Sequence, residues 1–269
     1  MDLTNHTSPL YSPLGIEYQQ AYSGPYEGIS TNNMVAALKQ GEISGFGRPV
    51  IDNGNVQTDE IHQLWHVSDR IWYRDYLIKG LSRASMFLMR NGLVPTPYYR
   101  QMIDLSQDNT VLFSKIRRSY KQLVKQWKDY EIVVVNSSYN ELERLKHLTA
   151  FKELHTKCAG RQTRDPKTWR VQSRMIAQKE AFLVLAYQDG LKAGAFFVFN
   201  KKTSYYFCSA CEDNSHFIIW RGILHSKKIG VRWVDMGERI FDQSHKQYGI
   251  SQFKGGFGGK VQVCLEFKL

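Results

Sequence analysis

The chain has 269 residues, of which 42% are hydrophobic and 23% charged, and these proportions are typical of a globular protein with one large domain or two small ones. It contains no apolar run of about eighteen residues and opens on the polar MDLTNHTS, so we expect neither a membrane span nor a secretory leader and place the protein in the cytoplasm. Four cysteines are too few for a disulfide scaffold, and a net charge of +11 predicts an anionic partner: nucleic acid, a phosphorylated substrate or an anionic membrane surface.

Residues 1–95 are irregular and aromatic, with the turn signals SPLG, SGPYEG, GFGRP and DNGN between short apolar pieces. We expect a helical segment within residues 58–90 and a strand near residues 98–105.

Residues 107–129 have the apolar periodicity of a helix. One face of that helix would carry the cationic stripe Arg117, Arg118, Lys121, Lys125 and Lys128, and no acidic residue interrupts the segment from Ser114 to Lys128. Such a stripe is either a solvated face or a site for the phosphates of a sugar nucleotide, a lipid or tRNA. Arg161 and Arg164 would extend it.

The middle of the chain predicts a strand at residues 131–135 and then two helices. Ser138 and Glu141 have the spacing of a capping box, and Gly160 would end the first helix. Asp165 and Pro166 are suited to begin the second as N-cap and first helical residue.

The pattern then changes to strands. Residues 181–187, 192–199 and 203–210 predict an antiparallel meander, because they are rich in β-branched and aromatic residues and are separated by turns. A helix at 216–229 and strands at 231–236 and 261–268 complete an α/β arrangement with a mixed sheet.

This order of elements resembles the Gcn5-related N-acetyltransferase (GNAT) fold. The segments MIDLSQDNTVLFSKIRRSYKQLVKQW, FKELHTKCAGR, WVDMGE and GISQFKGGFGG resemble, in matching order, the FemAB-like aminoacyl and acyl transferases of that superfamily. The resemblance implies a mixed, mostly antiparallel sheet flanked by helices. It also implies a trimmed N-terminal GNAT-like subdomain at residues 1–105 and an acyltransferase domain at residues 106–269.

The resemblance further implies an acyltransferase that forms an amide on an amine of a cell-envelope or surface-glycan precursor. The donor would be aminoacyl-tRNA or acyl-CoA, and the acceptor an anionic, phosphorylated small molecule or a lipid-linked precursor, which is compatible with peripheral membrane contact. Lys254 matches the lysine of the family's Phe-Lys motif and would stabilise the oxyanion, while Phe253 would shape the pocket beside it. No metal is implied.

Further residues gather around this expected site. Asp235 and Glu238 end a strand, where a carboxylate accepts the amine proton or forms an ion pair. Tyr205 and Tyr206 point to opposite faces, so at most one faces the cleft; Tyr206 is assigned to the substrate with Arg117, Arg118, Lys121 and Arg161. Glycines 255, 256, 258 and 259 would let the backbone approach a ligand closely.

Two alternative functions stay open. An acetyl-CoA-dependent N-acetyltransferase of a small molecule or nucleotide sugar would hold its donor at Asn214, Ser215 and His216, but the loop CEDNSH lacks the glycines that cradle a pyrophosphate. A non-enzymatic, basic nucleic-acid-binding protein would explain the charge alone. Cys208 and Cys211 form a CxxC that lacks the two further ligands of a zinc site.

Overall fold

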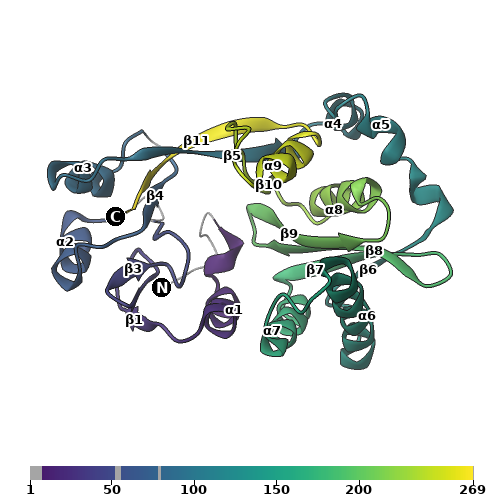
Figure 1. The fold of residues 1–269 in the computed structure, drawn as a ribbon, viewed down its shortest axis with the longest axis horizontal. Coiled ribbons are helices and arrows are strands. Elements are labelled where there is room, and N and C mark those ends of the chain that lie inside the picture. Colours follow the sequence, from purple (N-terminus) through teal and green to yellow (C-terminus); the bar gives the residue numbers. More distant parts are fainter. Residues whose placement is uncertain (1–7, 52–55, 78–79, 269) are drawn as a thin grey trace.

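The computed structural model describes residues 8–51, 56–77 and 80–268, which form an eight-stranded sheet, a three-stranded sheet and the helices around them (Figure 1). The strands of the large sheet are, in spatial order, β4 (Tyr73–Asp75), β11 (Lys260–Phe267), β5 (Thr96–Asp104), β10 (Trp233–Glu238), β9 (Thr203–Cys211), β8 (Leu191–Phe199), β7 (Ala181–Tyr187) and β6 (Glu131–Val135). Neighbouring strands are antiparallel except β9 and β10. The mixed, mostly antiparallel sheet expected from the sequence is therefore confirmed.

Helices cover both faces of the β6–β9 half of this sheet. Helices α6 (Glu141–Ala159) and α7 (Pro166–Ala177) pack on one face, and α8 (His216–Lys228) packs on the other (Figure 1). Buried side chains of β7 and β8 alternate between the two resulting cores, Leu183 and Leu185 facing one and Phe182 and Val184 the other. The alternation follows from the two-residue period of a strand.

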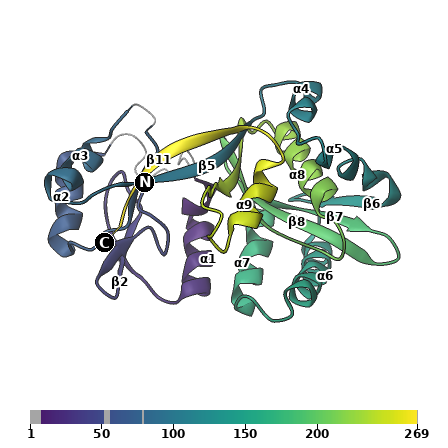
Figure 2. The same cartoon turned by 45° about the horizontal axis from the view of Figure 1, so that its top comes forward.

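The first part of the chain forms a smaller layer and also contributes to the large sheet. It contains η2 (Pro9–Tyr11), α1 (Pro13–Ser23), the three-stranded sheet β1 (Glu27–Ile29), β2 (Ala36–Lys39) and β3 (Glu42–Ser44), and the helices α2 (Thr58–Val67) and α3 (Arg83–Arg90). Strands β4 and β5 do not stay with this layer, because both pair with β11; Figure 2 shows β5 and β11 side by side. The division of the chain at residue 105 stays a prediction.

The predicted single helix over residues 107–129 is wrong. The segment forms α4 (Asn109–Ser114), α5 (Tyr120–Leu123) and the 3₁₀ turn η3 (Gln126–Asp129). The helical hydrogen-bond series breaks where the Arg117 backbone N–H donates to the carbonyl of Gly256 at 2.8 Å. The apolar positions still face inward, because Ile116, Tyr120 and Val124 lie in the same core as α8.

The predicted helix ends are correct in two of three cases. Gly160 ends α6 in the left-handed conformation, with φ of 65°, and Asp165 caps α7 through its side chain. The capping box predicted at Ser138 and Glu141 is wrong: Asn140 and Glu143 form it instead, while Ser138 hydrogen-bonds to Asn136. No helix in the described part of the chain is both long and apolar enough to span a bilayer.

Strands β9 and β10 separate part-way along the sheet. They pair only where Trp233–Asp235 meets Thr203–Tyr205, although both continue further. The pairing of β10 with β5 is irregular between Asp235 and Glu238, where Gly237 has φ of 90°. The sheet therefore opens beyond Asp235, between the only parallel pair of strands among the described residues. Crevices of this kind are common ligand sites in α/β sheets.

Candidate active site

Lys254 lies at the opening between β9 and β10. It belongs to the last turn of α9 (Tyr248–Gly255), so it is carried by a helix and not by the loop that its glycine-rich surroundings suggested. Its Nζ lies 3.1 Å from the point that a β-carbon on Gly237 would occupy, and 5.8 Å from the ring centroid of Tyr206. A side chain at position 237 would displace this amine. Gly237 is thus needed both for its positive φ and for the space above it.

The pKa values of the Lys254 amine and of the Glu238 carboxyl both shift in the direction that favours the neutral form of the group. Removal from water lowers the pKa of Lys254, and the nearby Asp235 and Glu238 only partly oppose this shift. Desolvation and repulsion by Glu266 raise the pKa of Glu238, although the residue as a whole is exposed and Arg74 and Lys254 oppose the shift. A carboxylate with a raised pKa is a better proton acceptor than an ordinary one.

Asp235 forms a buried ion pair with Arg100 of β5, with side chains 8% and 6% exposed. Its Oδ1 also accepts the backbone N–H of Gly237 at 2.8 Å. These contacts hold the strand end at the irregularity in β10. The ion-pair interpretation of Asp235 therefore applies, and the residue also lines a pocket.

That pocket, the Arg–Tyr pocket, has a volume of about 60 Å³ and lies between the N-terminal layer and the opened sheet. It is lined by Ser8, Leu10, Tyr11, Arg48, Pro49, Ile51, Arg74, Tyr76, Tyr98, Arg100, Tyr205, Asp235 and Gly237. Two of its guanidinium groups lie over aromatic rings, Arg74 at 3.3 Å from the Tyr98 centroid and Arg100 at 4.2 Å from that of Tyr76. Because Gly237 also lies beside Lys254, the pocket and the amine share a wall.

Arg48 supplies the positive charge of this pocket that none of the described carboxylates neutralises. Arg74 pairs with Glu266 and Arg100 with Asp235, whereas none of the described carboxylates lies within ion-pair distance of Arg48. Arg48 lies beside Tyr205, and when the Gln19 amide is oriented with its oxygen toward the guanidinium, that oxygen accepts from Arg48 Nε at 2.7 Å. An anionic group of a ligand would meet an uncompensated guanidinium here.

Tyrosine hydroxyls form much of the remaining polar surface of the pocket. Burial raises the pKa of Tyr98, Tyr76 and Tyr205, so these groups stay neutral and able to donate a hydrogen bond. Of the adjacent pair Tyr205 and Tyr206, Tyr205 faces the pocket. Tyr206 lies in the opposite core, below Lys254, and its hydroxyl is hydrogen-bonded to Ser209. The alternation predicted for this pair is observed.

The start of α8 is closed by the protein's own side chains. The Asn214 side chain accepts the backbone N–H of His216 at 2.8 Å, and Ser215 makes no cap. The His216 ring packs edge-on against Tyr120 and Phe253, with centroids 4.2 and 5.0 Å away. Burial and the charge of Arg117 lower the pKa of His216. Phe253 and Tyr120 thus fill the space beside the start of α8.

The residues of the cationic stripe lie in different surroundings. The Arg117 guanidinium donates to the Gln252 carbonyl at 3.0 Å and so ties α5 to α9, while Arg118 is exposed. Lys121 lies 5.7 Å from the Phe113 centroid. Arg161 is exposed and follows α6, and α6 packs on the other face of the sheet from α8 (Figure 1).

The glycine run packs against the protein itself. A β-carbon on Gly256 would lie 2.1 Å from the Tyr120 ring, one on Gly258 2.9 Å from the Lys115 carbonyl oxygen, and one on Gly259 2.2 Å from that of Met102. Gly258 and Gly259 do have positive φ, as expected. Their closest neighbours within the chain are the main-chain carbonyls of Lys115 and Met102, and the prediction that they approach a ligand stays a prediction.

Sequence reasoning missed the Arg–Tyr pocket because its arginines come from distant segments. Arg48 follows the small sheet, whereas Arg74 and Arg100 lie on β4 and β5, and only the insertion of β11 brings these strands to one site. The sequence does contain a partial signal of this pocket. Tyr98 and Arg100 are two residues apart and so share one face of a strand.

No group of three or more His, Cys, Asp or Glu side chains within residues 8–51, 56–77 and 80–268 is arranged to hold a metal ion. The thiols of Cys208 and Cys211 are free. Burial raises the pKa of both thiols.

Solved structures share this architecture over nearly the whole chain. The crystal structure of FemX superposes with a TM-score of 0.68 at 13% identity, covering 100% of this chain and 97% of FemX. The chain has the fold of FemX. The FemAB-like resemblance read from the sequence is thus confirmed at the level of fold.

Two further solved structures are also similar. The C-terminal domain of a putative lysylphosphatidylglycerol synthetase from Agrobacterium fabrum gives a TM-score of 0.63 at 11% identity, covering 100% of this chain and 90% of the domain. L-PGS from Bacillus licheniformis gives 0.63 at 10% identity, covering 95% of this chain and 85% of that one. No family model and no curated protein matches the sequence.

Proposed function

We propose that this protein transfers an aminoacyl or acyl group to an amine of an anionic acceptor, a cell-envelope or surface-glycan precursor. One observation carries the proposal: the Lys254 amine lies in the strand opening beside Gly237, and Gly237 also lines the Arg–Tyr pocket. A cation for a developing oxyanion and a site for an anionic acceptor are thereby adjacent.

The residues present suit each step of amide formation. Glu238, with its raised pKa, accepts a proton from the acceptor ammonium, and the free amine attacks the donor carbonyl to form the C–N bond. Lys254, as its ammonium form, stabilises the oxyanion of the tetrahedral intermediate. The C–O or C–S bond to the leaving group then breaks and the proton held by Glu238 passes to that group. The attacking nitrogen gives up its second proton to the freed Glu238 carboxylate, which releases it to solvent.

The Arg–Tyr pocket supports an acceptor that carries phosphate or carboxylate. Arginine binds such groups through its fork of N–H donors, and Arg48 lacks a carboxylate partner among the described residues. The name of one structural neighbour, a putative lysylphosphatidylglycerol synthetase, joins an amino acid to a phosphate-bearing lipid. Such a product combines the two chemistries that we propose for this site.

The closed start of α8 favours aminoacyl-tRNA over acetyl-CoA as the donor. The first N–H of this helix bonds to Asn214, and aromatic side chains occupy the adjacent space. A pyrophosphate needs free N–H groups at such a helix start. The cationic stripe within residues 117–128 offers a further surface for RNA phosphates.

The deciding experiment is single-turnover transfer from labelled aminoacyl-tRNA, and separately from acyl-CoA, to lipid-linked and nucleotide-linked amines. We expect Lys254→Ala to lower kcat by about 10²–10³-fold, the usual loss when one oxyanion donor is removed. Lys254→Arg keeps the charge and should retain part of the activity. Lys246→Ala removes an exposed lysine elsewhere and serves as the matched control.

Full activity of Lys254→Ala would remove Lys254 from the mechanism. Tight, steeply salt-dependent RNA binding without transfer to any amine would favour the non-enzymatic nucleic-acid-binding function instead.

A further inference from the structure

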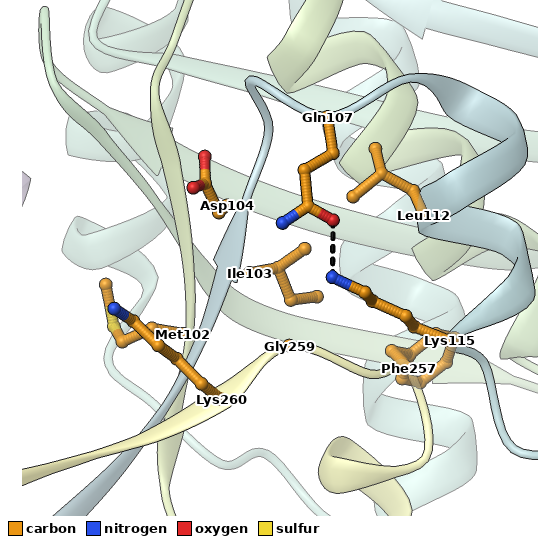
Figure 3. A pocket seen from close by; sticks show the side chains of 9 residues that line it. All are labelled: Met102, Ile103, Asp104, Gln107, Leu112, Lys115, Phe257, Gly259 and Lys260. Atoms are coloured by element: carbon orange, nitrogen blue, oxygen red, sulfur yellow. Dashed lines mark hydrogen bonds between the residues drawn. The ribbon is translucent and has the colours of Figure 1, made fainter.

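A second cavity lies at the C-terminal end of β5, where Met102 pairs with Lys260, the first residue of β11. Its volume is about 210 Å³, and it is lined by Met102, Ile103, Asp104, Gln107, Leu112, Lys115, Phe257, Gly259 and Lys260 (Figure 3). These residues come from the end of β5, the loop after it, α4, and the segment between α9 and β11. None of them lines the Arg–Tyr pocket.

The floor of this cavity is apolar and rigidly packed. Ile103, Leu112 and Phe257 are 2%, 3% and 1% exposed and belong to the core beneath α8. Gly259 forms a wall at which any side chain would meet the Met102 carbonyl. A cavity of about 150 Å³ lined by such side chains holds a benzene ring, so this one has room for a small ring or a short alkyl chain with a polar substituent.

Hydrogen-bond donors face the cavity, while its acceptors are already engaged. Lys115 Nζ donates to Gln107 Oε1 at 2.6 Å, which turns the amide nitrogen of Gln107 toward the cavity (Figure 3). The main-chain carbonyl of Gln107 accepts from Lys227. Asp104 receives the backbone N–H of Ser106 at 3.0 Å and Arg232 Nε at 3.2 Å.

The charge around the rim is positive. Lys115 and Lys260 line opposite sides of the cavity, and the carboxylate of Asp104 between them is paired with Arg232 (Figure 3). The exposed ammonium of Lys260 lies 5.1 Å from the Trp233 centroid and makes no ion pair with a described carboxylate. A site with donors at the rim and an apolar floor selects an anion attached to an apolar body.

We propose that this cavity is a second ligand site, for a small molecule or end group in which a phosphate monoester or carboxylate is attached to an aromatic ring or short alkyl chain. The anion binds Lys115, Lys260 and the Gln107 amide, and the apolar part lies on Ile103, Leu112 and Phe257. The backbone N–H of Phe257 donates to the Lys254 carbonyl at 3.3 Å, so a ligand here contacts the segment that ends α9.

Binding of phenyl phosphate and of benzoate to the full chain tests the proposal, with phenol as the neutral probe of equal ring size. We expect the methyl signals of Ile103 and Leu112 and the side-chain amide signal of Gln107 to shift with either anion in NMR titrations. The tighter of the two anions identifies the preferred charged group. Phenol should bind at least about tenfold more weakly.

Substitutions at the rim provide the second arm. Lys115→Gln with Lys260→Gln changes only exposed side chains and should weaken the anion at least about tenfold. The matched variant Lys146→Gln with Lys167→Gln removes the same charge from α6 and α7 and should bind as the native chain does. The proposal is overturned if the rim variant keeps its affinity, if phenol binds as tightly as the anions, or if these signals do not move. All three readouts are independent of transferase activity.

Discussion

At the scale of single residues, the proposed site depends on Lys254 and Glu238, whose pKa values shift toward each other. Lys254 has a pKa below the ordinary 10.5 because it is desolvated, and Glu238 has a pKa above the ordinary 4.5 for the same reason. The proposed reaction needs the first as a cation and the second as an anion. Activity should therefore exist only between the two pKa values.

We expect a bell-shaped dependence of kcat/KM on pH. Activity rises as pH increases through the raised pKa of Glu238 and falls as pH increases through the lowered pKa of Lys254. Lys254→Arg should move the alkaline limb to higher pH, because a guanidinium keeps its proton there. Glu238→Gln should remove the acid limb and lower kcat by about 10²–10⁴-fold. An unchanged acid limb in that variant would assign the proton acceptor to another group.

Gly249 within α9 and Gly256 directly after it should respond differently to substitution by alanine. Gly256→Ala places a β-carbon 2.1 Å from the Tyr120 ring, whereas Gly249→Ala in the same helix meets nothing within 4 Å. We expect urea unfolding to show a loss of about 1–3 kcal/mol for Gly256→Ala from overpacking. Gly249→Ala should gain roughly 0.5–1 kcal/mol, since alanine favours a helix. Equal stability of the two variants would contradict the packing role of the run.

At the scale of elements, the end of β10 depends on a charge pair that β5 completes. Removing one partner of a buried pair leaves the other uncompensated, at a cost of about 3–5 kcal/mol. Asp235→Ala should therefore destabilise the chain by about this amount in urea unfolding. Glu17→Ala breaks the exposed pair with Arg174 and should cost no more than about 1 kcal/mol. A cost for Asp235→Ala as small as this control would mean that the pair does not hold the strand end.

Elements with a strong local signal were predictable, and the site was only partly so. The meander β7–β9, α8, and the cap at Asp165 follow from local periodicity and capping chemistry. The break in the helix after Ser114 does not follow from local sequence, because it results from a hydrogen bond between Arg117 and Gly256, residues far apart in the sequence. Lys254 was predicted as a site residue from its motif, and its role stays a prediction. Arg48 was missed because its position depends on tertiary contacts.

At the scale of the whole molecule, the basic residues that give the net charge of +11 lie in different environments. Arg74 and Arg100 are neutralised by carboxylates inside the fold, whereas Arg118, Lys125 and Lys128 of the stripe are exposed. Exposed positive charge on one surface attracts polyanions through counterion release.

We expect tRNA to bind with an affinity that falls steeply with salt. Replacing Lys125 and Lys128 by Gln should reduce the slope of log K against log salt by about 0.7–0.9 for each phosphate that the variant no longer neutralises. Filter-binding titrations at several salt concentrations measure this slope. The variant Lys146→Gln with Lys167→Gln, of equal charge, is the control on α6 and α7. An equal slope for both double variants would mean that the stripe does not bind RNA.

The position of β11 also bears on how the chain is assembled. This strand lies between β4 and β5, yet residues 260–267 are synthesised long after residues 73–104. Until β11 arrives, β4 and β5 each keep an open edge, and Arg74 lacks its partner Glu266. The Arg–Tyr pocket consequently cannot be complete in a nascent chain. Unpaired edges of this kind are prone to aggregation, so we expect this protein to depend on rapid insertion of β11, or on a chaperone that covers the gap until it occurs.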